Sequence, residues 1–178
     1  GKTSCTHWLA QAWQMLSGEA GIVGTLGCGL IDASSRQETG LTTPDVLSNH
    51  RLIAAMVKEK AQMVAMEVSS HALDQQRVAG LSFRVAAFTN LTHDHLDYHG
   101  SMDAYAAAKA RLFDWPGLAA AVINIDDAMG AQLQHRSHAA RIITVSAHAD
   151  TQADIHAESI RIDASGIRKV FDLARSLK

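Results

Sequence analysis

Apolar residues near the start of the chain recur at the spacing of an α-helix. The set consists of Trp8, Leu9, Ala12, Trp13 and Leu16. Residues three and four positions apart share one helical face, so the pattern predicts a helix over 7–16. This helix would follow directly on Gly1-Lys2-Thr3-Ser4.

Short apolar runs further along the chain predict strands that alternate with helices. The runs cover 21–25, 62–68, 84–89, 119–125 and 141–145. Asp45 can cap a helix that runs to about Lys58, and Ser101 can cap an alanine-rich helix over 104–113. The alternation indicates an α/β fold with a mainly parallel sheet flanked by helices. Residues 27–44 are rich in Gly, Ser and Thr without a steady period, which predicts a substrate-facing loop.

The composition narrows the class of protein. The 178 residues suffice for one domain, and 47% hydrophobic and 19% charged residues are typical of a globular chain. The 16 Lys and Arg are dispersed and aromatics make up 5%, so we expect no nucleic-acid partner. No apolar run reaches the roughly 20 residues that span a bilayer, and we expect no membrane partner. Cys5 and Cys28 are isolated and lack the spacing of a zinc site, so we expect the protein in the reducing cytoplasm.

A phosphate-binding loop is the first candidate site. Gly1-Lys2-Thr3 stands at the entrance to the first predicted helix. Backbone N–H groups at such an entrance bind phosphate oxygens, lysine adds positive charge, and the threonine hydroxyl can reach Mg²⁺. Three residues also fit an ordinary helix start with a solvated lysine, and the sequence alone leaves both interpretations open.

A carboxylate ends the predicted strand over 62–68. Glu67 is followed by Ser69, Ser70 and His71. One interpretation is a strand-terminal residue that points to solvent. The other is a ligand for an oxygen-preferring cation such as Mg²⁺, because strand ends are where ligands bind in parallel sheets.

The segment from Thr89 to Gly100 holds three histidines and two aspartates within seven residues. So many polar groups are improbable in a core, because each would need a buried partner. His93 and His99 singly fit a solvated loop, whereas His95, next to Asp94 just beyond the strand end, favours metal binding.

Two cationic residues have an ordinary default interpretation. Lys109 lies in an alanine-rich helix, where a single lysine is usually a surface charge. Arg77 fits a helix terminus. Composition and spacing alone assign neither residue to a site.

Several motifs in one order resemble the Mur ligase family. They are Met66-Glu67-Val68-Ser69-Ser70-His71-Ala72-Leu73 with Arg77-Val78, the Thr89–Gly100 segment, the helix Ala107-Ala108-Lys109-Ala110-Arg111-Leu112-Phe113, and Val122-Ile123-Asn124-Ile125-Asp126-Asp127. The first is similar to the MurE-type branch. The resemblance covers about 1–163 and implies the P-loop type central ATP-binding domain of that family.

The resemblance implies an ATP-dependent, amide-bond-forming ligase of cell-wall peptidoglycan synthesis. Such an enzyme phosphorylates UDP-MurNAc-L-Ala-D-Glu, and the amine of a diamino acid, for which we expect meso-diaminopimelate, then attacks the acyl phosphate. The implied cofactors are ATP and Mg²⁺, and we expect a monomer. Alternatives are another Mur-family or folylpolyglutamate-type ligase, or a metallo-hydrolase that uses His93, His95 and Asp97, although the hydrolase motif breaks at Tyr98.

The resemblance also implies residue roles. ATP would bind at Gly1, Lys2, Thr3 and Ser4. The metal ligands and catalytic groups would be Thr3, Glu67, His95 and a carbamylated Lys109. The sugar-linked peptide would bind at Thr42, Thr43, Ser69, Gln75 and Arg77. We expect Lys2, Glu67, His95 and Lys109 to converge on one cleft.

The ends of the chain depart from the family pattern. The chain is expected to begin inside the phosphate loop, without the family's N-terminal UDP-binding and C-terminal amino-acid-binding domains. Residues 164–178 form a tail, in which Val170, Phe171, Ala174 and Leu177 predict a short amphipathic helix from Ile167 onward.

Overall fold

The protein is described by a computed structural model, in which the chain forms two compact units, Gly1–Leu81 and Ser82–Lys178. The described residues are 1–32, 36–149, 151–157, 161–163 and 166–168. Among these residues no helix combines the length and the apolar content needed to cross a membrane.

The first unit contains a three-stranded sheet in the order β2-β1-β3. Strand β1 pairs in parallel with β3 and antiparallel with β2. The elements in chain order are α1 (Lys2–Leu16), β1 (Ala20–Gly24), β2 (Gly27–Leu30), α2 (Val46–Lys58), β3 (Met63–Met66) and α3 (Ser70–Asp74).

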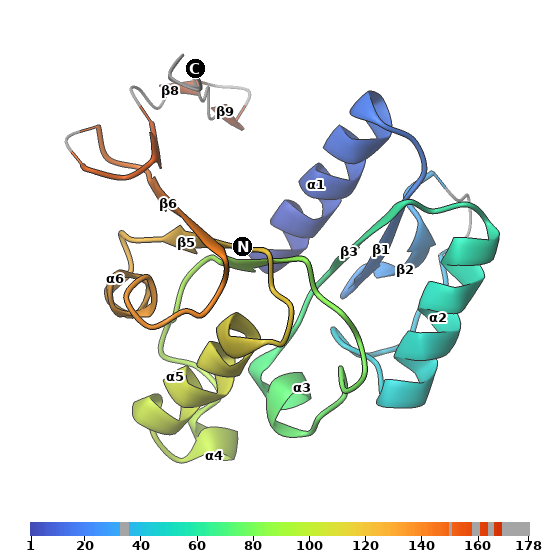
Figure 1. Cartoon of the computed structure of the whole chain (residues 1–178), viewed down its shortest axis with the longest axis horizontal. Coiled ribbons are helices and arrows are strands. Elements are labelled where there is room, and N and C mark those ends of the chain that lie inside the picture. The colour runs from blue at the N-terminus through green and yellow to red at the C-terminus, as the bar shows by residue number, and fades with distance from the viewer. Residues whose placement is uncertain (33–35, 150, 158–160, 164–165, 169–178) are drawn as a thin grey trace. The chain divides into compact units, whose positions relative to one another are not determined.

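Helices α1 and α2 cover opposite faces of this sheet, because consecutive residues of β1 point to opposite sides. Ile22 packs with Ala10 of α1, and Val23 packs with Met56 of α2. Figure 1 shows the two helices on either side of the strands. The strand is buried along its whole length, and near its carboxyl end, which Thr25 follows, Val23 pairs with Met66 of β3.

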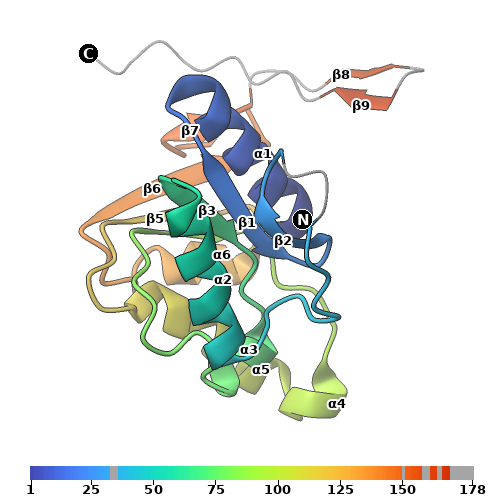
Figure 2. The same cartoon turned by 90° about the vertical axis from the view of Figure 1, so that its right-hand side faces the viewer.

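The second unit contains a parallel four-stranded sheet in the order β4-β5-β6-β7. Figures 1 and 2 show β5 and β6 side by side. The elements are β4 (Val85–Phe88), α4 (Leu96–His99), α5 (Met102–Ala110), the 3₁₀ turn η1 (Arg111–Asp114), β5 (Ala120–Asn124), α6 (Ala128–Leu133), β6 (Arg141–Ser146) and β7 (Ile155–His156). Beyond them, β8 (Arg161–Asp163) and β9 (Gly166–Arg168) form an antiparallel pair.

One hydrophobic cluster holds the second sheet against its helices. Its buried members are Ala86, Phe88, Phe113, Leu118, Ala121, Ile123 and Leu133. The rings of Phe88 and Phe113 meet edge to face with centroids 6.1 Å apart. This contact joins the end of β4 to η1, the turn that follows the helix carrying Lys109.

The predicted fold class is confirmed, since parallel strands alternate with flanking helices. The caps predicted at Asp45 and Ser101 are also present, because both side chains accept hydrogen bonds from their helix N-termini. Three details differ from the prediction. The strands are divided between separate sheets, and β2 occupies part of the loop expected over 27–44. The helix expected from Ile167 is wrong at its start, because Ile167 and Arg168 belong to β9; its continuation lies outside the described residues.

Gly130 allows α6 to pack directly on the end of β5. A Cβ atom there would lie 1.9 Å from the carbonyl oxygen of Asn124. A glycine-to-alanine change inside a helix usually stabilises it by roughly 0.5–1 kcal/mol. For Gly130→Ala we expect the opposite sign, a loss of about 3 kcal/mol in the free energy of unfolding, because backbone atoms must move.

Urea unfolding of Gly130→Ala measures this loss. Ala128→Ser, an exposed change on the same helix, serves as control and should lie within about 0.5 kcal/mol of wild type. A more stable Gly130→Ala protein would contradict the close approach of α6 to β5.

Candidate functional site

The phosphate-loop residues form the first turn of α1. Gly1 is the N-cap residue and has no side chain to cap the helix, and Lys2 and Ser4 are exposed. The hydroxyl of the half-buried Thr3 instead donates to Oε2 of Glu67 at 2.9 Å. The helix entrance thus presents N–H groups and a lysine, which suits a phosphate.

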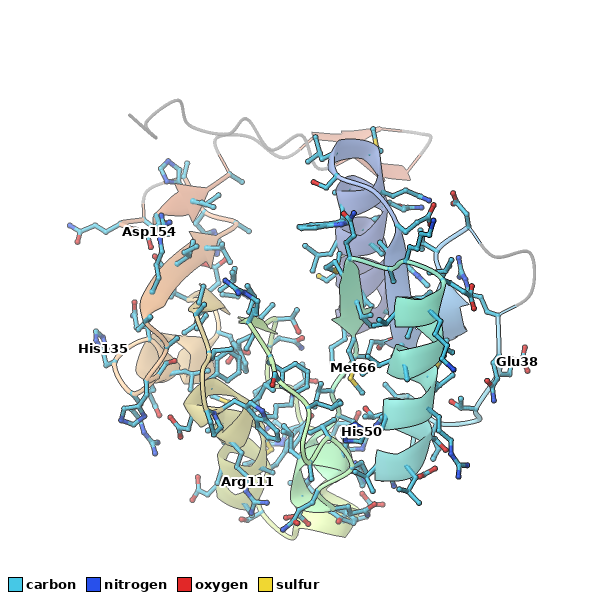
Figure 3. The ribbon with its side chains drawn as sticks, turned by 45° about the vertical axis from the view of Figure 1, so that its right-hand side comes forward. Glu38, His50, Met66, Arg111, His135 and Asp154 are labelled. Carbon is cyan, nitrogen blue, oxygen red and sulfur yellow. The ribbon has the colours of Figure 1, made fainter. Side chains whose placement is uncertain are left out.

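Glu67 is buried, with an exposed fraction of 3%. It follows Met66, labelled in Figure 3 at the end of β3. Its Oε1 accepts from the main-chain N–H of Thr25 at 2.9 Å, and its own N–H donates to the carbonyl of Val23. The solvent-exposed interpretation of Glu67 is therefore wrong, because β1 and the turn after it enclose the side chain.

Gly24 makes room for this carboxylate. A Cβ atom at position 24 would lie 2.3 Å from Oε1 of Glu67. Strand β1 therefore ends in a residue without a side chain at the point where the carboxylate needs space.

The residues implied for the sugar-linked peptide are connected to Glu67. Buried Thr43 donates its hydroxyl to the carbonyl oxygen of Glu67 at 2.8 Å and accepts from the N–H of Ser69 at 3.0 Å. The carbonyl oxygen of Thr43 accepts from Nη1 of Arg77 at 3.0 Å. Arg77 also donates through Nε and Nη2 to Oε1 of Gln75, at 2.8 and 2.6 Å.

Thr42 completes this network, since its hydroxyl oxygen lies 3.0 Å from that of Thr25. The structure therefore brings together, in the first unit, Thr3 of the phosphate loop and the site residues that the family resemblance implied over 42–77. They are Thr3, Thr42, Thr43, Glu67, Ser69, Gln75 and Arg77, and we call them, with Thr25, the Glu67 network.

Two members of this region carried no signal in the sequence. Thr25 follows a predicted strand in a glycine-rich stretch. Asn49 lies on α2, is fully buried, and donates from Nδ2 to the carbonyl oxygens of Pro44 and Arg77, each at 2.9 Å. A polar residue on an amphipathic helix normally faces water, so only the folded structure identifies Asn49 as the link between Arg77 and Pro44.

In the second unit, three side chains hold the start of the histidine segment, one each from β5, the N-cap of α6 and α5. The Nδ2 of Asn124 donates to the carbonyl oxygen of Thr89, and Oδ2 of Asp127 accepts from the N–H of Leu91, at 2.8 and 2.7 Å. The Nζ of Lys109 donates to the carbonyl oxygen of Asn90 at 2.8 Å. These contacts fix the path of the chain toward His95.

His95 and Lys109 contact the same aromatic ring. Tyr105 is buried, with an exposed fraction of 4%. The ring of His95 meets it edge to face at 5.8 Å, His99 stacks on it at 5.2 Å, and Nζ of Lys109 lies 4.8 Å from its centroid. Burial, and secondarily the charge of Asp94, raises the pKa of Tyr105, which keeps its hydroxyl neutral.

Lys109 is therefore more than a surface charge on an alanine-rich helix. It lies one helical turn after Tyr105 on α5, and the side chain is directed onto the histidine segment. His95 adopts a left-handed backbone conformation with φ of 56°, and its N–H donates to Oδ1 of Asp94 at 2.8 Å. That turn directs the ring of His95 toward Tyr105.

The donor atoms fit Mg²⁺ better than zinc. Glu67 and Thr3 place a carboxylate and a hydroxyl 2.9 Å apart, and oxygen ligands that leave room for water suit Mg²⁺. Within the described parts of the chain, no three His, Cys, Asp or Glu side chains form a group that could hold a metal ion. His93, His95 and Asp97, which the metallo-hydrolase alternative would use, form no such group.

Lys2, Thr3 and Glu67 belong to the first unit, and His95 and Lys109 belong to the second. Their convergence on one cleft stays a prediction. Within the first unit a hydrogen bond joins Thr3 to Glu67, and within the second His95 and Lys109 contact the ring of Tyr105.

These features define an α/β domain with a lysine at a helix entrance and a buried carboxylate beside it. Comparison with known proteins identifies the family to which this domain belongs. The sequence pattern of the Mur ligase middle domain matches residues 1–176, and the chain belongs to this family. The family resemblance of the sequence motifs is confirmed.

The relatives include UDP-N-acetylmuramoyl-L-alanyl-D-glutamate–2,6-diaminopimelate ligases. The one from Xanthomonas oryzae pv. oryzae is 53% identical over 174 residues, covering 97% of this chain and 35% of the relative. That from Pseudomonas aeruginosa is 50% identical over 168 residues, covering 94% and 34%. A solved structure of a ligase with the same name has a TM-score of 0.81 at 31% identity and covers 94% of this chain and 34% of its own. The chain thus spans about a third of the length of these relatives.

Proposed function

We propose that this chain is the ATP-binding domain of a ligase that joins meso-diaminopimelate to UDP-MurNAc-L-Ala-D-Glu. The observation that carries the proposal is the Glu67 network, which links the phosphate-loop residue Thr3 to residues 42–77 through a single buried carboxylate. The names of the relatives support the choice of substrates, and no relative reported above favours another Mur-family or folylpolyglutamate-type ligase.

The reaction requires two transfers. The γ-phosphoryl group passes from ATP to the D-Glu carboxylate, with release of ADP, and the amine then attacks the acyl carbon and displaces phosphate. Because hydroxide is a poor leaving group and phosphate a good one, the first transfer makes the second possible. The protein contributes position and charge neutralisation.

We assign the ATP phosphates to Gly1, Lys2, Thr3 and Ser4. The exposed ammonium of Lys2 and the N–H groups of the first turn of α1 would bind and orient the phosphate oxygens. One Mg²⁺ would be held by Thr3 and Glu67, and a second by His95 and a carbamylated Lys109. Bound metal supplies positive charge that offsets the negative charge on the phosphoryl oxygens.

The UDP-sugar peptide is assigned to Thr42, Thr43, Ser69, Gln75 and Arg77. Arg77 offers a planar group suited to a carboxylate, and its Nε and Nη2 donate to Oε1 of Gln75 while Nη1 donates to the carbonyl oxygen of Thr43. An anionic ligand could replace the neutral acceptor on Gln75. We further propose that the protein works as a monomer in the cytoplasm, where ATP and UDP-linked precursors are available.

Phosphate release by the full-length protein tests the function. With ATP, Mg²⁺ and UDP-MurNAc-L-Ala-D-Glu, we expect release that depends on meso-diaminopimelate and is weak with L-lysine. The 178-residue chain alone should be inactive, because positioning of uridine and amino acid by other domains can supply several kcal/mol of the barrier reduction. Release independent of any diamino acid would exclude the proposed ligase.

A further inference from the structure

Thr25 is the member of the Glu67 network to which neither the motifs nor the proposed function gives a role. Its main-chain N–H donates to Oε1 of Glu67 at 2.9 Å, and its hydroxyl oxygen lies 3.0 Å from that of Thr42. One residue therefore contacts the buried carboxylate through its backbone and a threonine of the peptide side through its side chain.

The hydroxyl proton of Thr25 has two acceptors within reach. Oε2 of Glu67 lies 3.5 Å away, which is beyond the usual O–H···O distance, and it already accepts from Thr3 at 2.9 Å. The Thr42 oxygen, at 3.0 Å, is the closer acceptor. Distance therefore favours donation from Thr25 to Thr42.

This direction decides what Thr42 can offer a ligand. A hydroxyl has one proton and can accept as well. When Thr42 accepts from Thr25, its own proton is available for an acceptor on the ligand. A carboxylate or carbonyl oxygen is such an acceptor, and the dipeptide part of the proposed substrate carries both.

We propose that Thr25 is a positioning residue that orients the Thr42 hydroxyl as a donor toward a carboxylate or carbonyl oxygen of the sugar-linked peptide. Its main-chain N–H separately holds Glu67. The inference rests on the proposed function, because that function supplies the ligand at Thr42. The two contacts of Thr25 can be separated by mutation, since valine keeps the N–H and the branched shape but lacks the hydroxyl.

Calorimetric binding of UDP-MurNAc-L-Ala-D-Glu to the full-length protein tests the side-chain contact. We expect Thr25→Val to weaken binding about three- to tenfold, the range of one net hydrogen bond. The KM for ATP and the Mg²⁺ dependence should stay within about twofold of wild type, because the N–H bond to Glu67 remains. Thr25→Ser keeps the hydroxyl and should bind as wild type does.

A double-mutant cycle tests the same bond without substrate. If the two hydroxyls are bonded, Thr25→Val and Thr42→Val together should lower the urea midpoint by less than the sum of the single changes. Additive losses, or unchanged peptide binding in Thr25→Val, would overturn the role of Thr25. The proposed function fails on a different result, the lack of diaminopimelate-dependent phosphate release by the wild-type protein.

Discussion

Glu67→Gln in the full-length protein is expected to lower kcat/KM by about 100-fold or more and to raise the Mg²⁺ concentration needed for half-maximal activity. Glutamine has the shape of glutamate but lacks its charge. A neutral amide oxygen is a weaker Mg²⁺ ligand than a carboxylate, and loss of even an outer partner of a metal site typically costs about 10- to 100-fold.

The substitution should leave the fold intact, because the hydrogen bonds around position 67 can be kept. The amide oxygen can still accept from the N–H of Thr25, and the amide nitrogen can donate to the Thr3 hydroxyl, which is able to accept. A loss of activity with an unchanged unfolding midpoint would therefore report on charge alone.

Glu59→Gln provides the matched control, because Glu59 is exposed at the C-terminal end of α2. It removes the same charge from the same unit and should leave kinetics unchanged. If Glu67→Gln shows the Mg²⁺ dependence of the wild type, Glu67 is a structural carboxylate and the assignment of Thr3 and Glu67 to a metal is wrong.

Much of the fold could be predicted because the hydrophobic periodicity of the sequence indicates where helices and strands form. The helix after Gly1, the strand ending at Glu67 and the caps at Asp45 and Ser101 all have local signals. Strand β2 has none, because the run Gly27-Cys28-Gly29-Leu30 is dominated by glycine and lacks β-branched residues. It forms a strand only because β1 offers an edge with which it can pair.

The site residues could be predicted where they lie in dense sequence motifs. They could not be predicted where their role depends on burial and on contacts made in the folded protein. Spacing drew attention to Glu67 and His95, but it could not show that Glu67 is enclosed. Tyr105 has no distinguishing signal within the alanine-rich helix predicted over 104–113, although its ring contacts both His95 and Lys109. Such contacts join residues that are apart in sequence, so no local pattern reports them.

Lys109→Ala in the full-length protein is expected to lower turnover by about 1000-fold while the fold survives. The proposed carbamate forms when the neutral amine adds to carbon dioxide and releases a proton, giving a group that carries negative charge. Removing a preorganised charged group beside a transferring phosphoryl typically costs about 10²- to 10³-fold. An ordinary surface lysine would give a change within about 0.5 kcal/mol in stability and intact turnover.

The contacts of Lys109 favour the functional alternative. Its amine reaches the carbonyl oxygen of Asn90 and lies over the ring of Tyr105, which His95 also contacts. A side chain directed outward would have neither contact. A carbamate formed on this amine would lie on the side of α5 that faces the histidine segment.

Two measurements separate the alternatives. Carbon-13 NMR with labelled bicarbonate should show a carbamate signal in the wild-type protein that is lost in Lys109→Ala, and a short carboxylic acid such as acetate should restore part of the turnover of the variant by standing in for the carbamate oxygens. Lys58→Ala, at an exposed lysine in the last turn of α2, is the control and should change neither signal nor turnover. Alanine has no amine and cannot form a carbamate. Near-normal turnover in Lys109→Ala would therefore show that turnover needs no carbamate at this position, and it would refute the role outright.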